Sequence, residues 1–329
     1  MPKKRLPSLS KSALLKRCQA WAIDSSREYE KSLSAGDDLT AMNDGNDVHD
    51  AIDVGIKTGT PPILEKEPLN RMVGHAMELV AAYKEAGWKL TSEVCFQVSQ
   101  SGPGGVPSAS MIVLPGPREY PYLVGHVYGT ADIVGTKSTA DGKVTDVLVA
   151  DWKTGGTDSA EDQLKSLGWA AWMVYPDANI HLQTLKLTED SVWIIGYPDV
   201  GEPIGRTQLA EHWNLMSRSY KAVDAQKYKP NPGIHCTQLY CPHLAFCGAF
   251  EAAEAQASER ESEGYTKLTD APGSNSEAGK VMATLSAIKR RTKYYEAALK
   301  RYVETGGRVI AGDYIWSQGK DGFRWRKQK

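Results

Sequence analysis

The 329-residue sequence contains no apolar run long enough to cross a membrane, and its start, MPKKRLPSLSKS, lacks the apolar core of a signal peptide. These two absences predict a cytoplasmic protein with no membrane partner. Only five cysteines are present, which does not suggest a disulfide framework in a chain of this size. Metal ligation or plain burial is therefore the expected use of the thiols.

Hydrophobic residues make up 41% and charged residues 24% of the chain, an ordinary balance for a globular protein with a substantial core. Apolar periodicity predicts interleaved helices and strands, which indicates an α/β (α+β) fold with a mixed sheet. The polar stretch 34–47 is expected to be a loop. Helices are expected at 7–33, 45–59, 67–87, 158–175, 207–220 and 281–304, and strands at 90–98, 128–135, 144–152, 180–188 and 191–198.

Charge is unevenly distributed along the chain. The segment Val281–Lys329 carries 12 lysines and arginines against 4 acidic residues, a balance of +8, whereas the whole chain has a net charge of −1, so the first 280 residues carry −9. A basic tail is compatible with a polyanionic partner such as DNA. It is equally compatible with a solvated helix face followed by a basic terminus.

The segment Val127–Gly156 is the most informative part of the sequence. Two β-branched runs flank an Asp-Gly pair, which favours the tight turn of a β-hairpin. Asp132 lies on the first strand, and Asp151 and Lys153 share one face at the end of the second. Two carboxylates can hold a hard cation beside an ammonium, which suits metal-assisted phosphodiester cleavage. An Asp-x-Lys triplet is also typical of a solvated strand edge, so other segments must decide between the two interpretations.

Three of the five cysteines, Cys236, Cys241 and Cys247, fall within twelve residues, and such clustering indicates a soft metal site. Candidates for a fourth ligand are Cys18, Cys95, His235 and His243. The chain lacks the two Cys-x-x-Cys knuckles of a zinc ribbon. A 4Fe-4S cluster therefore fits better than a structural Zn²⁺, which stays the alternative, with three free thiols as a third.

Taken in order, these segments resemble the RecB-like branch of the PD-(D/E)XK nuclease superfamily. The resemblance is closest to its iron–sulfur members, which include the nuclease domain of AddB, the four-cysteine CRISPR-associated exonucleases and phage-encoded relatives. SLSKSALLKRCQAW is similar to the family's Ser-rich helix ending in the first cluster cysteine, GTAD to its Gly-x-x-Asp motif and VADWKTG to its (D/E)-x-K motif. GNDVHDAID and SEVCFQV resemble the segments with a metal-binding histidine and an accessory glutamate. The resemblance covers Leu6–Phe250.

The resemblance implies a restriction-endonuclease-like mixed sheet flanked by helices, with a cysteine-cluster subdomain joining the N- and C-terminal regions. It implies that Mg²⁺ or Mn²⁺ binds to His49, Asp132 and Asp151. It also implies that Lys153 acts in catalysis, that Glu93 holds a second metal or a water, and that Gln163 contacts the nucleic acid. The implied cluster ligands are Cys18, Cys236, Cys241 and Cys247.

Two positions depart from the family's pattern. The first gap of the cysteine cluster has four residues where two are usual, and Leu167 stands where the Gln-x-x-x-Tyr motif has its tyrosine. The first departure makes Cys236 the least typical of the four implied ligands, and the second bears on the DNA contact near Gln163.

The expected organisation is a nuclease domain over 1–250, a polar linker over 251–280, and a basic C-terminal helix and tail over 281–329. The expected function is that of a metal-dependent DNA nuclease, foremost an exonuclease, acting on single- or double-stranded ends in recombination, repair or phage replication. A recombination or replication protein is an expected partner. The alternatives are a non-catalytic DNA-binding or scaffolding protein that keeps the fold, and a zinc-stapled interaction module whose hairpin carboxylates are only surface charge.

Overall fold

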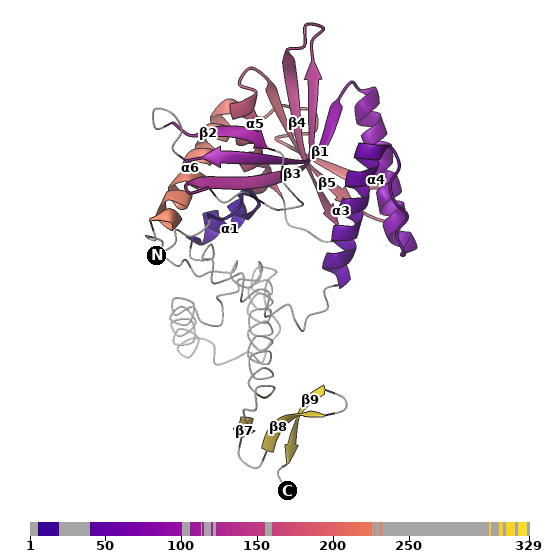
Figure 1. The fold of residues 1–329 in the computed structure, drawn as a ribbon, viewed down its shortest axis with the longest axis vertical. Coiled ribbons are helices and arrows are strands. Elements are labelled where there is room, and N and C mark those ends of the chain that lie inside the picture. Colours follow the sequence, from indigo (N-terminus) through magenta and orange to yellow (C-terminus); the bar gives the residue numbers. More distant parts are fainter. Residues whose placement is uncertain are drawn as a thin grey trace, which may run out of the picture. The chain divides into compact units, whose positions relative to one another are not determined.

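The computed structural model describes residues 6–19, 40–100, 106–112, 123–154, 160–225, 309–311, 314–319 and 322–327, together with residues 114, 120, 227, 231 and 303. The chain forms two compact units, one made of 1–24 and 38–229, the other of 25–37 and 230–329. The first unit contains a six-stranded mixed sheet flanked by helices, which confirms the α/β class (Figure 1). Across the described ranges, no helix has both the length and the apolar character needed to cross a membrane.

The sheet of the first unit has the strand order β2-β1-β3-β4-β5-β6. Its strands are β1 (Lys89–Ser99), β2 (Ser108–Ile112), β3 (His126–Ser138), β4 (Val144–Thr154), β5 (Asn179–Leu187) and β6 (Val192–Tyr197). Strands β4 and β5 are parallel, and each other neighbouring pair is antiparallel. Helix α5 (Glu161–Val174) connects β4 to β5, because parallel strands need a crossover. The carboxyl ends of β4 and β5 therefore lie side by side at the same end of the sheet.

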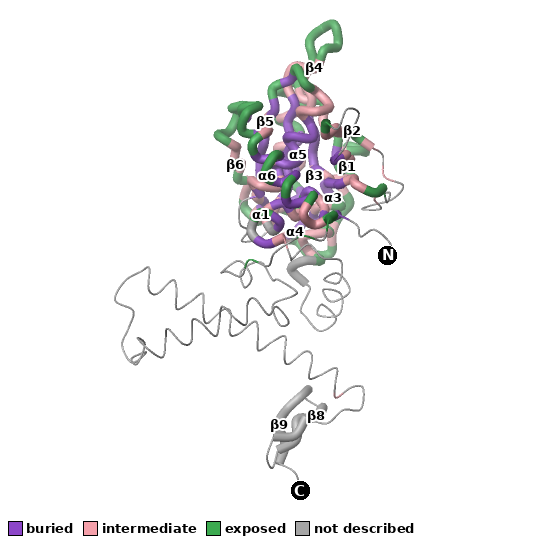
Figure 2. The backbone as a smooth tube through the Cα atoms, turned by 90° about the vertical axis from the view of Figure 1, so that its left-hand side faces the viewer, coloured by how far each residue is buried: buried purple, intermediate pink, exposed green. Residues whose placement is uncertain are grey.

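Helices cover both faces of the sheet. The short η1 (Leu9–Lys11), α1 (Ser12–Arg17), α5 and α6 (Arg206–Asp224) enclose one hydrophobic core, here called the α5-side core. Helices α3 (Thr40–Thr58) and α4 (Glu67–Glu85) enclose a second, the α3-side core. Figure 2 shows buried residues concentrated along α5 and along β3, β4 and β5, the strands that lie between the two helical layers.

The central hairpin is confirmed as β3 and β4. Gly142 at its turn has a φ of +85°, a conformation that glycine adopts without a steric penalty. Gly129 on β3 serves a different purpose, because a Cβ atom there would lie 2.5 Å from the Cβ of Leu9. The glycine of the Gly-x-x-Asp segment thus lets the N-terminal segment pack directly on the sheet.

Two sequence predictions about helices need correction. The predicted loop at 34–47 is helical from Thr40, so His49 lies in the middle of α3 and not near its start. Its stretch of Asn, Asp and Gly has low helix propensity, but the fully buried Val48, Ala51 and Ile52 pack the helix on the α3-side core, and packing overrides propensity. The helix predicted at 7–33 ends at Arg17 in the described part, and residues 20–33 lie outside the described residues.

Two groups of strands were not predicted. Strand β2 lies between the predicted strands at 90–98 and 128–135. In the second unit, β7 (Val309–Ala311), β8 (Tyr314–Gly319) and β9 (Gly322–Lys327) form an antiparallel three-stranded sheet within the basic tail. The helix predicted at 281–304 lies outside the described residues except for residue 303.

Candidate active site

Three carboxylates occupy the same level on three neighbouring strands. On β1 and β3, the pairs Ser92–Ile133 and Val94–Ala131 bracket Glu93 and Asp132, which are therefore level with each other. On β3 and β4, the pairing runs up to Ile133–Ala150, so the next positions carry Asp132 and Asp151. The separate sequence segments that carry Glu93, Asp132 and Asp151 thus converge in one row across the sheet.

The backbone is irregular at this level of the sheet. Glu93 has a φ of +51°, a conformation that is uncommon for a residue with a Cβ atom. Ser92, just before it, donates to Asp53 of α3 at 2.6 Å, whereas Val94, just after it, belongs to the α5-side core. Alternation along a regular strand would place both on one face, so β1 changes faces at Glu93. The carboxylate row therefore lies where the side chains of β1 change from the α3-side core to the α5-side core.

Asp132 is held by the backbone of β4 and faces α3. The N–H of Trp152 donates to Asp132 Oδ2 at 2.7 Å. His49 on α3 places Nδ1 3.5 Å from the same oxygen. Because Trp152 is itself fully buried in the α3-side core, the donor has a fixed position. The structure thus brings His49 and Asp132 together.

Asp151 lies on the α5 side of the sheet, and its side chain is almost fully buried. Gln163, in the first turn of α5, donates from Nε2 to Asp151 Oδ1 at 2.7 Å. Lys153 Nζ forms an ion pair with Asp151 Oδ2, which receives no directed hydrogen bond. One carboxylate oxygen is therefore fixed by α5 and the other lies against the ammonium, as expected from the spacing of Asp151 and Lys153 on one face.

The electrostatics of the row favour a bound cation. Burial, followed by the negative charges of Asp151 and Glu93, raises the pKa of Asp132 well above its ordinary value. The Trp152 N–H and the Lys153 ammonium lower the pKa of Asp132, but they do not outweigh the first three causes. A divalent cation would relieve the same repulsion, since an opposite charge nearby stabilises the ionised carboxylate.

The donor set suits a hard cation that keeps part of its water shell. Within the part of the chain that the structure describes, no group of three or more His, Cys, Asp or Glu side chains is arranged to hold a metal ion. Mg²⁺ is commonly bound by one or two carboxylates and several waters, so it does not need a full protein cage. Asp132 and Asp151 provide such a pair, and the buried Asp151 Oδ2 lacks a directed donor. The residues present therefore fit Mg²⁺ or Mn²⁺.

Of the four implied cluster ligands, the structure describes only Cys18. Cys18 follows α1 and is buried. Cys95, the other candidate for the fourth ligand, is fully buried in the middle of the sheet, and burial raises the pKa of its thiol to about 11. A raised pKa disfavours the thiolate that a metal requires, which leaves Cys18 as the better cysteine candidate. Cys236, Cys241 and Cys247 lie outside the described residues.

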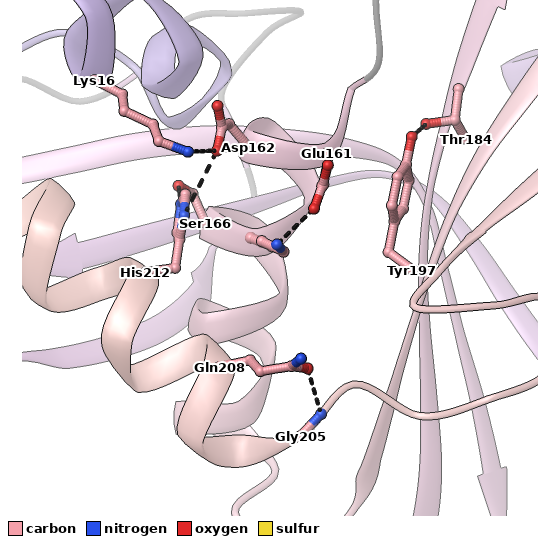
Figure 3. A network of polar contacts seen from close by, with 10 residues as sticks. Lys16, Glu161, Asp162, Ser166, Thr184, Tyr197, Gly205, Gln208 and His212 are labelled. Atoms are coloured by element: carbon pink, nitrogen blue, oxygen red, sulfur yellow. Dashed lines mark hydrogen bonds and ion pairs between the residues drawn. The ribbon is translucent and has the colours of Figure 1, made fainter.

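A buried polar network beside the site was not predicted from the sequence (Figure 3). Ser166 Oγ lies 2.7 Å from Ser12 Oγ and 2.8 Å from His212 Nε2. Asp162 accepts from Lys16 at 3.0 Å and lies 3.8 Å from His212 Nδ1. Ser166 is fully buried, so no substrate can reach this Ser–His–Asp set, and its role is structural. It ties the N-terminal segment to the first turns of α5.

No signal in the sequence marks this network, because its members come from three helices that are far apart in the sequence. His212 lies among buried apolar residues of α6, where a single histidine has no distinctive spacing. The network bears on the candidate site because Asp162 directly precedes Gln163 in the first turn of α5. The network therefore holds in place the turn that supports Asp151.

Comparison with known proteins identifies no family. No protein-family profile and no curated protein matches the chain. Among solved structures, a chain described as "Crystal structure of SSO0001" is similar over 76% of this chain and 89% of its own length, with 15% identity and a TM-score of 0.37. Similarity at this level carries no argument about function.

Proposed function

We propose that this chain is a divalent-metal-dependent deoxyribonuclease with a restriction-endonuclease-like fold. The observation that carries the proposal is the convergence of Glu93, Asp132 and Asp151 in one row, with Lys153 paired to Asp151. Paired carboxylates that suit Mg²⁺ or Mn²⁺, next to a lysine, are the groups needed to hydrolyse a phosphodiester bond. The resemblance of the same segments to RecB-like nucleases supports the same conclusion.

Each side chain has a distinct task in this proposal. Asp132 and Asp151 would hold the cation, which when bound lowers the pKa of a water and neutralises charge on the scissile phosphate. Lys153 keeps a positive charge beside Asp151, where it can orient the attacking water or stabilise the pentavalent phosphorus. Gln163 fixes the orientation of the Asp151 carboxylate through its hydrogen bond. His49 lies close enough to Asp132 to complete the metal environment.

A cleavage assay tests the proposed activity. The purified chain is incubated with linear single- and double-stranded DNA, each labelled at one defined end, with Mg²⁺, Mn²⁺ or EDTA. We expect degradation with either cation and none with EDTA. Early release of the label from one end would establish exonuclease action and its polarity. Binding of DNA without cleavage under all cation conditions would instead support a non-catalytic DNA-binding or scaffolding role.

We propose in addition that Cys18, Cys236, Cys241 and Cys247 bind a 4Fe-4S cluster. Its support is the clustering of three cysteines in the sequence and the burial of Cys18 at the end of α1. Protein purified without oxygen is expected to be brown and to contain iron and acid-labile sulfide in equal amounts. Cys18→Ser should lower both contents, whereas Cys95→Ser should leave them unchanged. A colourless protein that contains zinc would contradict the proposal.

The setting that best fits this activity is cytoplasmic processing of DNA ends. Recombination, repair and phage replication all produce such ends and would supply a partner protein that brings the nuclease to them. The basic segment Val281–Lys329 offers a further region of attraction for the DNA backbone, with a balance of +8.

A further inference from the structure

The candidate site continues across the sheet toward its edge strand. On β4 and β5, Lys153 pairs with Lys186, and on β5 and β6, Lys186 pairs with Trp193. These three residues therefore form a second row, which runs from the site to the sheet edge. The row carries two cations and one aromatic side chain.

The three residues lie on the same face of the sheet as Asp151. On β5, Leu182 belongs to the α5-side core and Leu185 to the α3-side core, so Lys186 is on the α5 side by alternation. On β6, Ile194 packs against the α3-side core, which places Trp193 on the α5 side as well. The row thus extends the surface that carries the site.

Trp193 and its neighbour on this face are unusually exposed for large apolar side chains. Trp193 is 65% exposed and Ile195, two positions along β6, is 44% exposed. Lys186 is partly exposed, and among the described residues it takes part in no ion pair. Figure 2 shows that exposure increases toward the edge of the sheet, because β5 is mainly buried and β6 is mainly intermediate or exposed. The indole of Trp193 and the ammonium of Lys186 therefore lie next to each other at the surface.

We propose that Trp193 and Lys186 form a nucleotide subsite beside the scissile phosphate, in which Trp193 stacks on a base and Lys186 contacts a phosphate. This inference rests on the proposed nuclease function. Aromatic side chains on a positively charged track bind single-stranded nucleic acid because every base has a face that can stack. Strands lie about 4.8 Å apart, so two strand spacings place Trp193 roughly 10 Å from the Lys153 position, within reach of a nucleotide adjoining the cleaved bond.

Charge and position favour nucleic acid over a protein partner. The row begins at Lys153 and continues through Lys186, so its charge complements a phosphate backbone. It also lies at the carboxyl ends of the parallel strands β4 and β5, where open α/β sheets commonly bind their ligands. A second copy of the chain pairing along β6 would use the backbone of the edge strand and would not require Lys186.

The test measures binding in the absence of cleavage. Fluorescence anisotropy with a labelled single-stranded oligonucleotide is carried out in EDTA on the full chain and on Trp193→Ala, Trp193→Phe and Lys186→Gln. We expect Trp193→Ala to weaken binding roughly 5- to 100-fold, the effect of losing one stacked base, and Trp193→Phe to retain most of the affinity. Lys186→Gln should weaken binding and reduce its dependence on salt concentration. Ile63→Ala, at a position that is 91% exposed, is the matched surface control and should bind as the unmodified chain does.

An abasic oligomer of the same length separates stacking from other effects. The unmodified chain and Trp193→Ala should bind it equally, because it offers no base to stack. Equal affinity of both proteins for the normal oligonucleotide would overturn the subsite. It would also be overturned if Trp193→Ala weakened binding of the abasic oligomer as much as binding of the normal one. A dimer that dissociates on Trp193→Ala would overturn it in favour of a contact between copies.

The outcomes also distinguish this inference from the proposed function. Stacking at Trp193 without any cleavage in Mn²⁺ would refute the nuclease activity and leave the subsite intact. Cleavage that Trp193→Ala leaves unchanged in both KM and kcat would refute only the subsite.

Discussion

A chain carrying Asp151→Asn is expected to lose nuclease activity by at least about 10³-fold while it remains folded. The amide oxygen of asparagine can still accept from Gln163, so the local hydrogen bond survives. What disappears is the negative charge that would hold the cation and pair with Lys153. Removal of the buried charge relieves the repulsion on Asp132, which offsets part of the stability lost with the ion pair to Lys153.

Lys153→Met tests the second half of the same pair, because it removes the ammonium and keeps an unbranched side chain. We expect a loss of roughly 10²- to 10³-fold in kcat, the usual effect of deleting one charge-stabilising donor from an active site. Lys143→Met is the matched control, since Lys143 lies near the hairpin turn and pairs with Asp177. Initial cleavage rates and thermal melting are measured on all three variants. Full activity of Asp151→Asn or Lys153→Met would contradict the assignment of the site.

The stability of the fold is expected to fall by about 3 kcal/mol as the pH drops from 6.5 to 4, through His212 alone. Burial is the main cause that lowers the pKa of His212, from 6.5 to about 4, and the ammonium groups of Lys16 and Lys165 act in the same direction, whereas Asp162 opposes them. The unfolded chain therefore binds this proton more readily than the folded chain. Between the two pKa values, protonation draws the equilibrium toward the unfolded state.

His212→Gln isolates this contribution, because glutamine can hydrogen-bond to Ser166 but does not titrate. Urea unfolding of both proteins at several pH values between 4 and 7.5 gives the difference in free energy of unfolding. We expect the unmodified chain to lose up to about 1.4 kcal/mol per pH unit more than the variant in this window. Asp132 acts with the opposite sign, since its raised pKa makes its contribution to stability increase as pH falls, and it is common to both proteins. Parallel pH profiles would show that His212 is not buried in its neutral form.

The parts of the site that depend on turn residues and on the alternation of side chains along a strand could be predicted from the sequence. The Asp-Gly turn and alternation along the strand place Asp151 and Lys153 on one face, and the structure confirms both. The bond from Gln163 to Asp151 could not be derived in this way, because it depends on how α5 crosses back over the sheet. Only the resemblance to nucleases singled out Gln163. The Trp152 N–H that holds Asp132 has no sequence signal, since every residue except proline carries the same donor.

The errors in the fold prediction have different physical causes. The start of α3 was missed because tertiary packing outweighs the poor helix propensity of the Asn-, Asp- and Gly-rich stretch before Val48. Strand β2 is short and mostly half-exposed, so it has no clear apolar alternation. Strands β8 and β9 did carry a signal, since YIWSQG and GFRWRK alternate around turn residues, but the basic charge of the tail is equally typical of a solvated terminus.

The crossover between β4 and β5 has a consequence for the order in which the protein becomes active. Strands β3 and β4 can pair as soon as their hairpin closes, an event of about 1–10 μs. The hydrogen bond of Gln163 requires α5 to be formed and docked, and the Ser12–Ser166 contact joins residues 154 positions apart. A chain still emerging from the ribosome would therefore carry the carboxylates before it could use them. If the chain is the proposed nuclease, cleavage would begin only after α5 has docked on the sheet.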